Sequence, residues 1–268
     1  MNPTVGNMSD YIVFIFDCQV SYIHNIVVVT RKGKIKRTPL SAYKNVRKNG
    51  LIAVGLDEGD EIAGIRMTSG NSELFIATKN GMAIRIAEQN VRSMSRSAHG
   101  VKAIKLRGDD EVVSMARMRE GASLLTITDM GYGRRTSLDS YKLQNRGGFG
   151  LKNYAVSKKN GNVCGIKVVD ETDDAIIISN DGVIIRIRCS DVRLMGRYAA
   201  GVKVMRVTDD SRVVSFTRAE HDEDEEIQEV EQPTDAEIEQ DRQNAKAEAL
   251  EAEQKSGEGT ENTDDDTE

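Results

Sequence analysis

Arginine recurs at one place in this sequence, four residues after a glycine that closes a β-rich apolar run. The four arginines are Arg37, Arg85, Arg135 and Arg186, and two of them are doubled, by Lys36 and Arg134. Duplex nucleic acid carries one negative charge per ~1.7 Å of its axis, so cationic groups at matched positions can bind it through its phosphates alone. We therefore expect these side chains to neutralise phosphate.

Two further sets of basic residues repeat with the same period. The loop after the second strand of each unit carries Arg47 and Lys48, then Arg92 and Arg96, then Lys142 and Arg146, then Arg193 and Arg197. A second recurring glycine is followed by Lys102, Lys152 and Lys203. Equivalent positions in radially related units occupy equivalent places, so we predict a continuous basic band. The alternative is that these bases only keep exposed strand edges soluble.

The elements that must position these residues form a repeat of about fifty residues. Apolar runs at 26–30, 74–78, 124–128 and 176–179 each precede a tight turn. The turns end in Gly33, Gly81, Gly131 and Gly182, which are 48, 50 and 51 residues apart. Turn sequences such as Asn-Gly and Asp-Gly between apolar runs are typical of β-hairpins, because their residues tolerate positive φ.

A third strand is predicted after the second glycine of each unit, and a fourth strand follows an acidic or polar turn. The second glycines are Gly50, Gly100, Gly150 and Gly201, with spacings of 50, 50 and 51 residues. A four-stranded unit of this size cannot bury both faces alone, so the units must pack against one another. We predict an all-β, propeller-like domain over 26–219, with repeats at about 26–72, 73–122, 123–173 and 174–219. Residues 1–25 do not show the full repeat and are a non-repeat segment or the remnant of a preceding blade.

Charge divides the chain into a basic body and an acidic tail. The tail, from Glu220 to Glu268, holds 21 of the 43 acidic residues and three of the 37 bases, so residues 1–219 carry a net charge of +12. The tail has too few large apolar residues to offset the entropy of ordering a packed domain, and we predict that 220–268 is disordered. It would either solubilise the chain or compete with DNA for the basic band as a tethered polyanion.

Several classes of function are excluded or disfavoured by what the sequence lacks. The three cysteines form no C-x-x-C pair, which argues against a zinc site and fits a reducing, cytoplasmic compartment. The three histidines show no catalytic spacing, so we expect no metal, no cofactor and no catalytic residue in this chain. Aromatic residues make up 4% of the chain and do not repeat beside the bases, which disfavours single-strand binding. The mode of nucleic-acid binding that the sequence still favours is contact with the phosphates of bent duplex DNA.

One segment resembles a known motif. Residues 144–150, Gln-Asn-Arg-Gly-Gly-Phe-Gly, resemble the basic box Q-R/K-R-G-G-R/K-G of the C-terminal domain of the A subunit of bacterial DNA gyrase. The segments 79–81, 131–136 and 192–197 resemble blades of that subunit in the expected order. The motif residues present here are Gln144, Arg146, Gly147, Gly148 and Gly150, whereas Asn145 and Phe149 replace two bases.

This resemblance, over roughly 26–268, implies a β-pinwheel: a propeller-like disc that exchanges strands between neighbouring blades and wraps duplex DNA around its basic perimeter. It implies a partner catalytic core and B subunit in a bacterial, nucleoid-associated type II topoisomerase that uses ATP and magnesium elsewhere. Nothing in 1–25 resembles the breakage-reunion region, so we expect a portion that lacks this region and the first blade. The alternatives are the A-type subunit of topoisomerase IV and a non-catalytic propeller that binds proteins.

Overall fold

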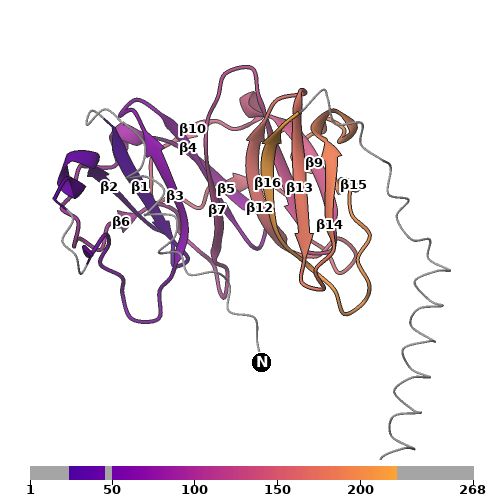
Figure 1. Ribbon diagram of the computed structural model, residues 1–268, viewed down its shortest axis with the longest axis horizontal. Helices are drawn as coiled ribbons and strands as arrows, with labels where there is room; N and C mark the ends of the chain where they lie inside the picture. Colours follow the sequence, from indigo (N-terminus) through magenta and orange to yellow (C-terminus); the bar gives the residue numbers. More distant parts are fainter. Residues whose placement is uncertain (1–23, 46–49, 222–268) are drawn as a thin grey trace, which may run out of the picture. The chain divides into compact units, whose positions relative to one another are not determined.

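The computed structural model describes residues 24–45 and 50–221, which form short β-sheets joined by turns (Figure 1). Within this part of the chain the only helical elements are four single 3₁₀ turns. These are η1 (Leu40–Tyr43), η2 (Glu88–Asn90), η3 (Leu138–Ser140) and η4 (Cys189–Asp191). None of the described helices has the length and apolar character needed to cross a bilayer. The prediction of an all-β, four-bladed propeller is confirmed; residues 1–23 and the tail beyond His221 lie outside the described residues.

Each repeat builds most of one antiparallel sheet from a hairpin and an inner strand. The first sheet contains β1 (Asn25–Thr30), β2 (Lys34–Pro39) and β3 (Ile62–Thr68), and the second contains β4 (Glu73–Thr78), β5 (Met82–Ala87) and β7 (Val112–Arg117). The third contains β8 (Ser123–Thr128), β9 (Tyr132–Ser137) and β12 (Val163–Val169), and the fourth contains β13 (Asp173–Ser179), β14 (Ile184–Arg188) and β16 (Val213–Glu220). The first strand of every hairpin lies in the middle of its sheet, which explains its unbroken apolar sequence.

Neighbouring repeats exchange a short strand. β6 (Val101–Lys102) pairs with β2, β11 (Leu151–Lys152) pairs with β5, and β15 (Val202–Lys203) pairs with β9, so each completes the sheet of the preceding repeat. β10 (Leu143–Gln144) also pairs with β5, in parallel. This is the strand exchange that the resemblance implied. In each of these sheets the donated strand lies at the end opposite to the inner strand.

The recurring glycines allow the donated strands to approach. Gly131 has a φ of 74°, and a Cβ built on it would overlap the Met205 carbonyl oxygen, just beyond donated strand β15. Gly182 takes the same place in the fourth sheet, which receives no strand among the described residues. Its φ is 88°, but a Cβ there would meet nothing within 4 Å. Both positions therefore require a positive φ, but only Gly131 also lacks the space for a Cβ atom.

We expect Gly131→Ala to destabilise the fold more than Gly182→Ala does. Positive φ at a non-glycine residue costs about 1 kcal/mol at either position. At Gly131 the clash with backbone raises the loss in unfolding free energy to about 3 kcal/mol. Urea denaturation of the two variants measures both losses, and equal losses would show that contact with the donated strand is unimportant.

Apolar side chains fill the spaces between successive sheets. Val27 and Val29 of the first sheet lie in one cluster with Leu74 and Ile76 of the second, and further clusters join the second to the third sheet and the third to the fourth. Val, Ile, Leu and Met dominate the first and third of these interfaces, as expected for a chain without Trp, whereas alanines, Phe75 and Tyr141 make up most of the interface between the second and third sheets. The inner strands β3, β7, β12 and β16 contact one another in this order and line a central cavity.

Candidate nucleic-acid interface

Three segments, which we call the exchange segments, run along the outer edge of the preceding sheet. They are 92–102, 142–152 and 193–203. Near its start, each bridges in parallel to the second strand of the preceding repeat, through Ser93 to Arg37, Leu143 to Arg85 and Leu194 to Arg135. Each then ends in the donated strand β6, β11 or β15. Whatever the exchange segments expose therefore lies on the outer edge of the propeller.

Cationic residues occupy three matched positions on each exchange segment. The first position holds Arg92, Lys142 and Arg193; the second, four residues later, holds Arg96, Arg146 and Arg197; the third, six residues after that, holds Lys102, Lys152 and Lys203. Side chains at the first and third positions are exposed in all three segments. In the described part of the chain this gives nine cations in register, which we call the outer-edge set.

The arginine at the second position also holds the exchange segments together. Arg146 Nη1 donates to the Lys102 carbonyl oxygen at 3.2 Å, and Arg197 Nη1 donates to that of Lys152 at 2.9 Å. Arg96 Nη1 makes the equivalent bond to the Ile52 carbonyl oxygen at 3.3 Å. A guanidinium has five donors, so this bond leaves others available to a phosphate. Arg146 and Arg197 are thereby placed beside the last lysine of the preceding exchange segment.

The box-like segment 144–150 lies against the preceding exchange segment. Gly147, with a φ of 83°, donates its backbone N–H to the Ala103 carbonyl oxygen at 2.6 Å, and Gly148 accepts from Lys105 at 2.8 Å. Gly150, with a φ of 73°, lies too close to the Ala83 carbonyl oxygen for any Cβ. Gln144 pairs with β5 through its backbone. These residues shape the segment that presents Arg146.

Phe149 adds two cations to this surface that the sequence did not indicate. It stands where the motif has a base, but its ring lies 4.8 Å from Lys105 Nζ and 4.2 Å from Arg107 Cζ, measured to the ring centroid. Both cations are exposed. Cation–π contact of this kind contributes about 0.5–1 kcal/mol at exposed sites and fixes the side-chain position. Lys105 and Arg107 do not recur at equivalent positions in the other repeats, so the sequence pattern did not indicate them.

Two of the predicted phosphate ligands, Arg134 and Lys36, are almost completely buried, and their assignment is corrected. Arg134 is 0% exposed; it donates to the Asn153 carbonyl oxygen and, at 2.9 Å, to that of Arg197, and it lies 4.9 Å from the Tyr154 ring centroid. Burial lowers the pKa of Arg134 below its usual value. Lys36 is 1% exposed and donates to the carbonyl oxygens of Ala53 and Arg96, and burial lowers its pKa to about 8. Both cations support exchange segments from inside.

The arginines four residues after the first glycine join sheets or pair with carboxylates. Arg85 Nε donates to Glu73 at 2.6 Å and its Nη1 to the Tyr141 carbonyl oxygen at 3.0 Å. Arg135, 5% exposed, donates to the Val192 carbonyl oxygen at 2.7 Å. The other two lie near acids, Arg37 at 3.9 Å from Glu88 and Arg186 at 2.8 Å from Asp174. We therefore no longer assign Arg135 as a phosphate ligand. For Arg37, Arg85 and Arg186, the main role that we assign is to make these contacts within the protein.

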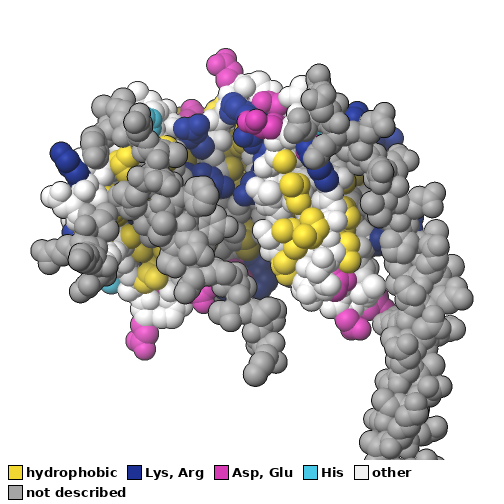
Figure 2. Space-filling view, in the orientation of Figure 1, with side chains coloured by type: hydrophobic (Ala, Val, Ile, Leu, Met, Phe, Trp, Pro, Cys, Tyr) yellow, Lys and Arg dark blue, Asp and Glu magenta, His cyan; other side chains and the backbone are white. Residues whose placement is uncertain are grey.

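The remaining predicted residues, Arg47 and Lys48, lie outside the described residues. Figure 2 shows Lys and Arg side chains gathered along the upper part of one face, above an apolar area near β16. The continuous basic band stays a prediction, and the structure changes its proposed members. It consists of the outer-edge set with Lys105 and Arg107 added.

Comparison with known proteins shows what this arrangement is similar to. The model of a family described as the DNA gyrase C-terminal domain, a β-propeller, matches residues 24–69, 72–117, 122–170 and 173–220. The gyrase A protein of Staphylococcus aureus strain NCTC 8325 is 39% identical over 211 residues, which cover 78% of this chain and 24% of the relative. The chain thus spans about a quarter of the length of the curated relatives that it matches.

Two solved structures have the same fold. The C-terminal domain of DNA topoisomerase IV superimposes with a TM-score of 0.71 at 27% identity, covering 76% of this chain and 64% of that one. The DNA gyrase A C-terminal domain gives a TM-score of 0.69 at 25% identity, covering 75% and 67%. Since the family model matches most of the chain, one repeat after another, the chain belongs to the family of the DNA gyrase C-terminal domain.

Proposed function

We propose that this chain binds duplex DNA along its outer edge and bends the duplex around the propeller. The observation that carries this proposal is the outer-edge set, three cations on each of three exchange segments at identical spacing. The three segments bind to successive sheets in the same way, so their cations follow one another around the edge. A duplex that contacts all of them must curve.

The proposed contacts are made with the sugar-phosphate backbone and do not recognise the base sequence. The set consists of lysines and arginines, and no α-helix among the described residues is available to enter a groove. The Phe149 ring already contacts two cations, so it supports phosphate ligands instead of stacking on a base. Affinity then depends on counterion release and on how easily the duplex bends.

Within the family, this activity belongs to the A subunit of gyrase. The chain would present a bent DNA segment to the catalytic core of the A subunit, which acts with the B subunit in a bacterial cytoplasmic holoenzyme. ATP and magnesium are used elsewhere in that assembly, and this chain contributes no catalytic residue. Supercoiling is thus a property of the holoenzyme, to which the chain contributes the geometry of the bound DNA.

A second candidate is the corresponding domain of topoisomerase IV, which the TM-score of 0.71 favours. Curated relatives at 39% identity are gyrase A proteins, and for this reason we place gyrase first. The two candidates differ in whether the bound circle gains net writhe. A third candidate, a protein-binding scaffold, predicts partners that are retained from lysate after nuclease treatment.

A salt titration tests the proposal. If the nine cations of the outer-edge set each neutralise about one phosphate, log K for a duplex of about 40 base pairs falls against log salt with a slope near −8. Fluorescence anisotropy of labelled duplex with the full chain, from about 50 to 300 mM salt, measures this slope. A slope shallower than about −2 would mean that only one or two cations contact DNA, and the wrapping proposal would be wrong.

A further inference from the structure

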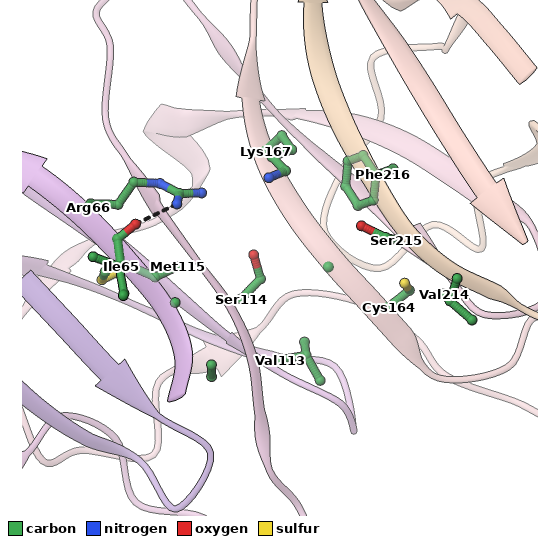
Figure 3. Close-up of a pocket in the computed structure, with 13 residues that line it drawn as sticks. Ile65, Arg66, Val113, Ser114, Met115, Cys164, Lys167, Val214, Ser215 and Phe216 are labelled. Carbon is green, nitrogen blue, oxygen red and sulfur yellow. Dashed lines mark hydrogen bonds between the residues drawn. The ribbon is translucent and has the colours of Figure 1, made fainter. Parts of the chain in front are cut away.

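The fourth sheet has an outer edge that no described strand covers. Its inner strand, β16, lines the central cavity with Val214, Ser215 and Phe216 (Figure 3), so its other edge is β14. The outer strands β2, β5 and β9 of the other sheets each receive a donated strand, whereas β14 receives none among the described residues. Within the described chain, β14 therefore presents backbone groups to which another strand can add.

Apolar and polar groups at this edge lack the cover that their equivalents have in other repeats. Ile184, the first residue of β14, is 63% exposed, whereas Ile35, at the same place in β2, is 0% exposed. The Gly33 carbonyl oxygen accepts a hydrogen bond from the Ala103 N–H at 2.8 Å. The Gly182 carbonyl oxygen, at the same place in the fourth repeat, accepts no backbone hydrogen bond from the described residues. The fourth sheet thus has the acceptor half of an exchange contact without the donor half.

The first repeat has the opposite half, a donor segment that pairs with no described strand. This segment, 51–53, follows Gly50, whose φ is 76°. The glycines before the donated strands have similar φ values, 85° at Gly100, 73° at Gly150 and 81° at Gly201. A Cβ built on Gly100 would overlap the Ile35 carbonyl oxygen of the acceptor strand β2. A Cβ built on Gly50 would meet nothing within 4 Å, so the donor segment has the backbone conformation for exchange but no acceptor.

Side chains hold this donor segment in the same way as a donated strand. Arg96 Nη1 donates to the Ile52 carbonyl oxygen at 3.3 Å, and Lys36 Nζ donates to the Ala53 carbonyl oxygen at 2.9 Å. Arg146 makes the bond that corresponds to the first of these, at 3.2 Å to the donated strand β6. Because the segment is already fixed, pairing with another strand costs little additional ordering entropy.

We infer that two copies of this chain associate head to tail, with the donor segment 51–53 of one copy added to β14 of the other. The three exchange contacts within the chain define the register. In that register Leu51 lies opposite Ile184, and the Ala53 N–H donates to the Gly182 carbonyl oxygen. The new contact therefore covers the exposed apolar side chain and supplies the missing hydrogen bond of the fourth sheet.

A second copy fits this edge because it supplies a strand of the kind that the fold already accepts. The donor segment begins Gly-Leu, as 150–151 does before it pairs with β5. The donated strands have lysine at the position of Ile52, which is 69% exposed. In the same register Ile52 lies opposite Val183, another exposed apolar residue, so the two unpaired halves match each other in polarity. Among the described residues, no other segment after a second glycine is unpaired.

Sedimentation velocity of the full chain without DNA tests the association. An edge contact of this size is expected to have a Kd of about 10 to 100 µM. The average mass should therefore rise above the 29.6 kDa of one chain as the concentration increases. Because donor and acceptor are different surfaces, species larger than dimers should also form. A wild type that stays monomeric up to about 500 µM would overturn the proposal.

Alanine at either glycine of the proposed contact should prevent association. Gly50→Ala places a Cβ against the incoming β14 backbone, as it would at Gly100, and Gly182→Ala places one against the incoming donor segment, as it would at Gly131. We expect each variant to associate at least about tenfold more weakly than the wild type. Gly121→Ala is the matched control, because Gly121 has a φ of 77° and space for a Cβ but lies outside the exchange segments. This control should associate as the wild type does.

A mixture of the two variants identifies the occupant of β14. The Gly50→Ala chain keeps its acceptor edge, and the Gly182→Ala chain keeps its donor segment, so the mixture should form dimers and nothing larger. Absence of mixed dimers overturns the proposal, as does equal association of both variants and the wild type. If a peptide of residues 50–56 binds a wild type that remains monomeric, β14 accepts a strand from another protein and the proposal is wrong. The measurements contain no DNA, so they and the salt titration can fail independently.

Discussion

Replacing both Lys102 and Lys152 with alanine is expected to weaken DNA binding by about 10- to 100-fold at 0.1 M salt. Both lysines are exposed at the end of an exchange segment. Each phosphate contact contributes about 0.9 to the slope of log K against log salt, so the double variant should have a slope shallower by about 1.8. The stability of the fold should change little, because neither ammonium is buried.

The control is a second double variant with the same change in net charge. Lys158 and Lys159 are exposed, but they belong to the turn 157–161, in which the Gly161 N–H donates to the Ser157 carbonyl oxygen at 2.9 Å, and not to an exchange segment. Lys158→Ala/Lys159→Ala should keep most of the affinity and nearly the whole slope. If both double variants lose affinity equally, net charge alone controls binding and the outer-edge set has no special role.

Replacing Arg134 with methionine is expected to lower the unfolding free energy by about 2 to 4 kcal/mol. Methionine fills part of the volume but leaves the carbonyl oxygens of Asn153 and Arg197 without their buried donor. Burying the guanidinium has a cost of its own, which makes the net loss smaller than the sum of its bonds. For a domain of this size, the Tm should fall by about 5 to 15 °C.

The exposed Arg146 provides the contrast to Arg134. Arg146→Met should change the Tm by at most a few degrees, because water replaces the donors to Asn90 and Lys102. It should instead reduce the salt slope by about 1, whereas Arg134→Met, measured at a temperature where it is folded, should keep the slope of the wild type. A stable Arg134→Met variant with a reduced slope would restore Arg134 as a phosphate ligand.

The repeat and its hairpins could be predicted from the sequence because they depend on local signals. A positive-φ glycine after an apolar run specifies a tight turn wherever it occurs, and four copies at nearly equal spacing specify a radial array. The strand exchange has no local signal, because β6, β11 and β15 contain two residues each. The family resemblance supplied that expectation.

The burial of Arg134 and Arg135 could not be predicted from the strand pattern. A strand covered on one face alternates apolar and polar residues, which shows the side that faces inward. β9 is covered on both faces, so Gly133, Arg134, Arg135 and Thr136 are all buried and no alternation remains. Charge at a repeated position therefore indicated surface charge, although carbonyl oxygens of Asn153 and, in the next repeat, of Val192 and Arg197 accept hydrogen bonds from it inside.

The central cavity could not be predicted from the sequence, because residues of all four inner strands form it. Arg66 and Lys167 are 101 residues apart, and nothing in the sequence shows that both line one cavity. Their equivalence becomes clear only when the bulges align β3 with β12. The position of Lys105 and Arg107 could not be predicted for a similar reason, since the Phe149 ring that they contact belongs to the following repeat.

The most direct test of the central claim measures the shape of the bound DNA. A nicked circular plasmid is saturated with the full chain, sealed with ligase, freed of protein and analysed on two-dimensional gels. If the outer-edge set bends duplex around the propeller, the topoisomer distribution shifts to one side of the protein-free control, and the shift grows with the amount of bound protein. A distribution identical to the control at full occupancy would contradict the account.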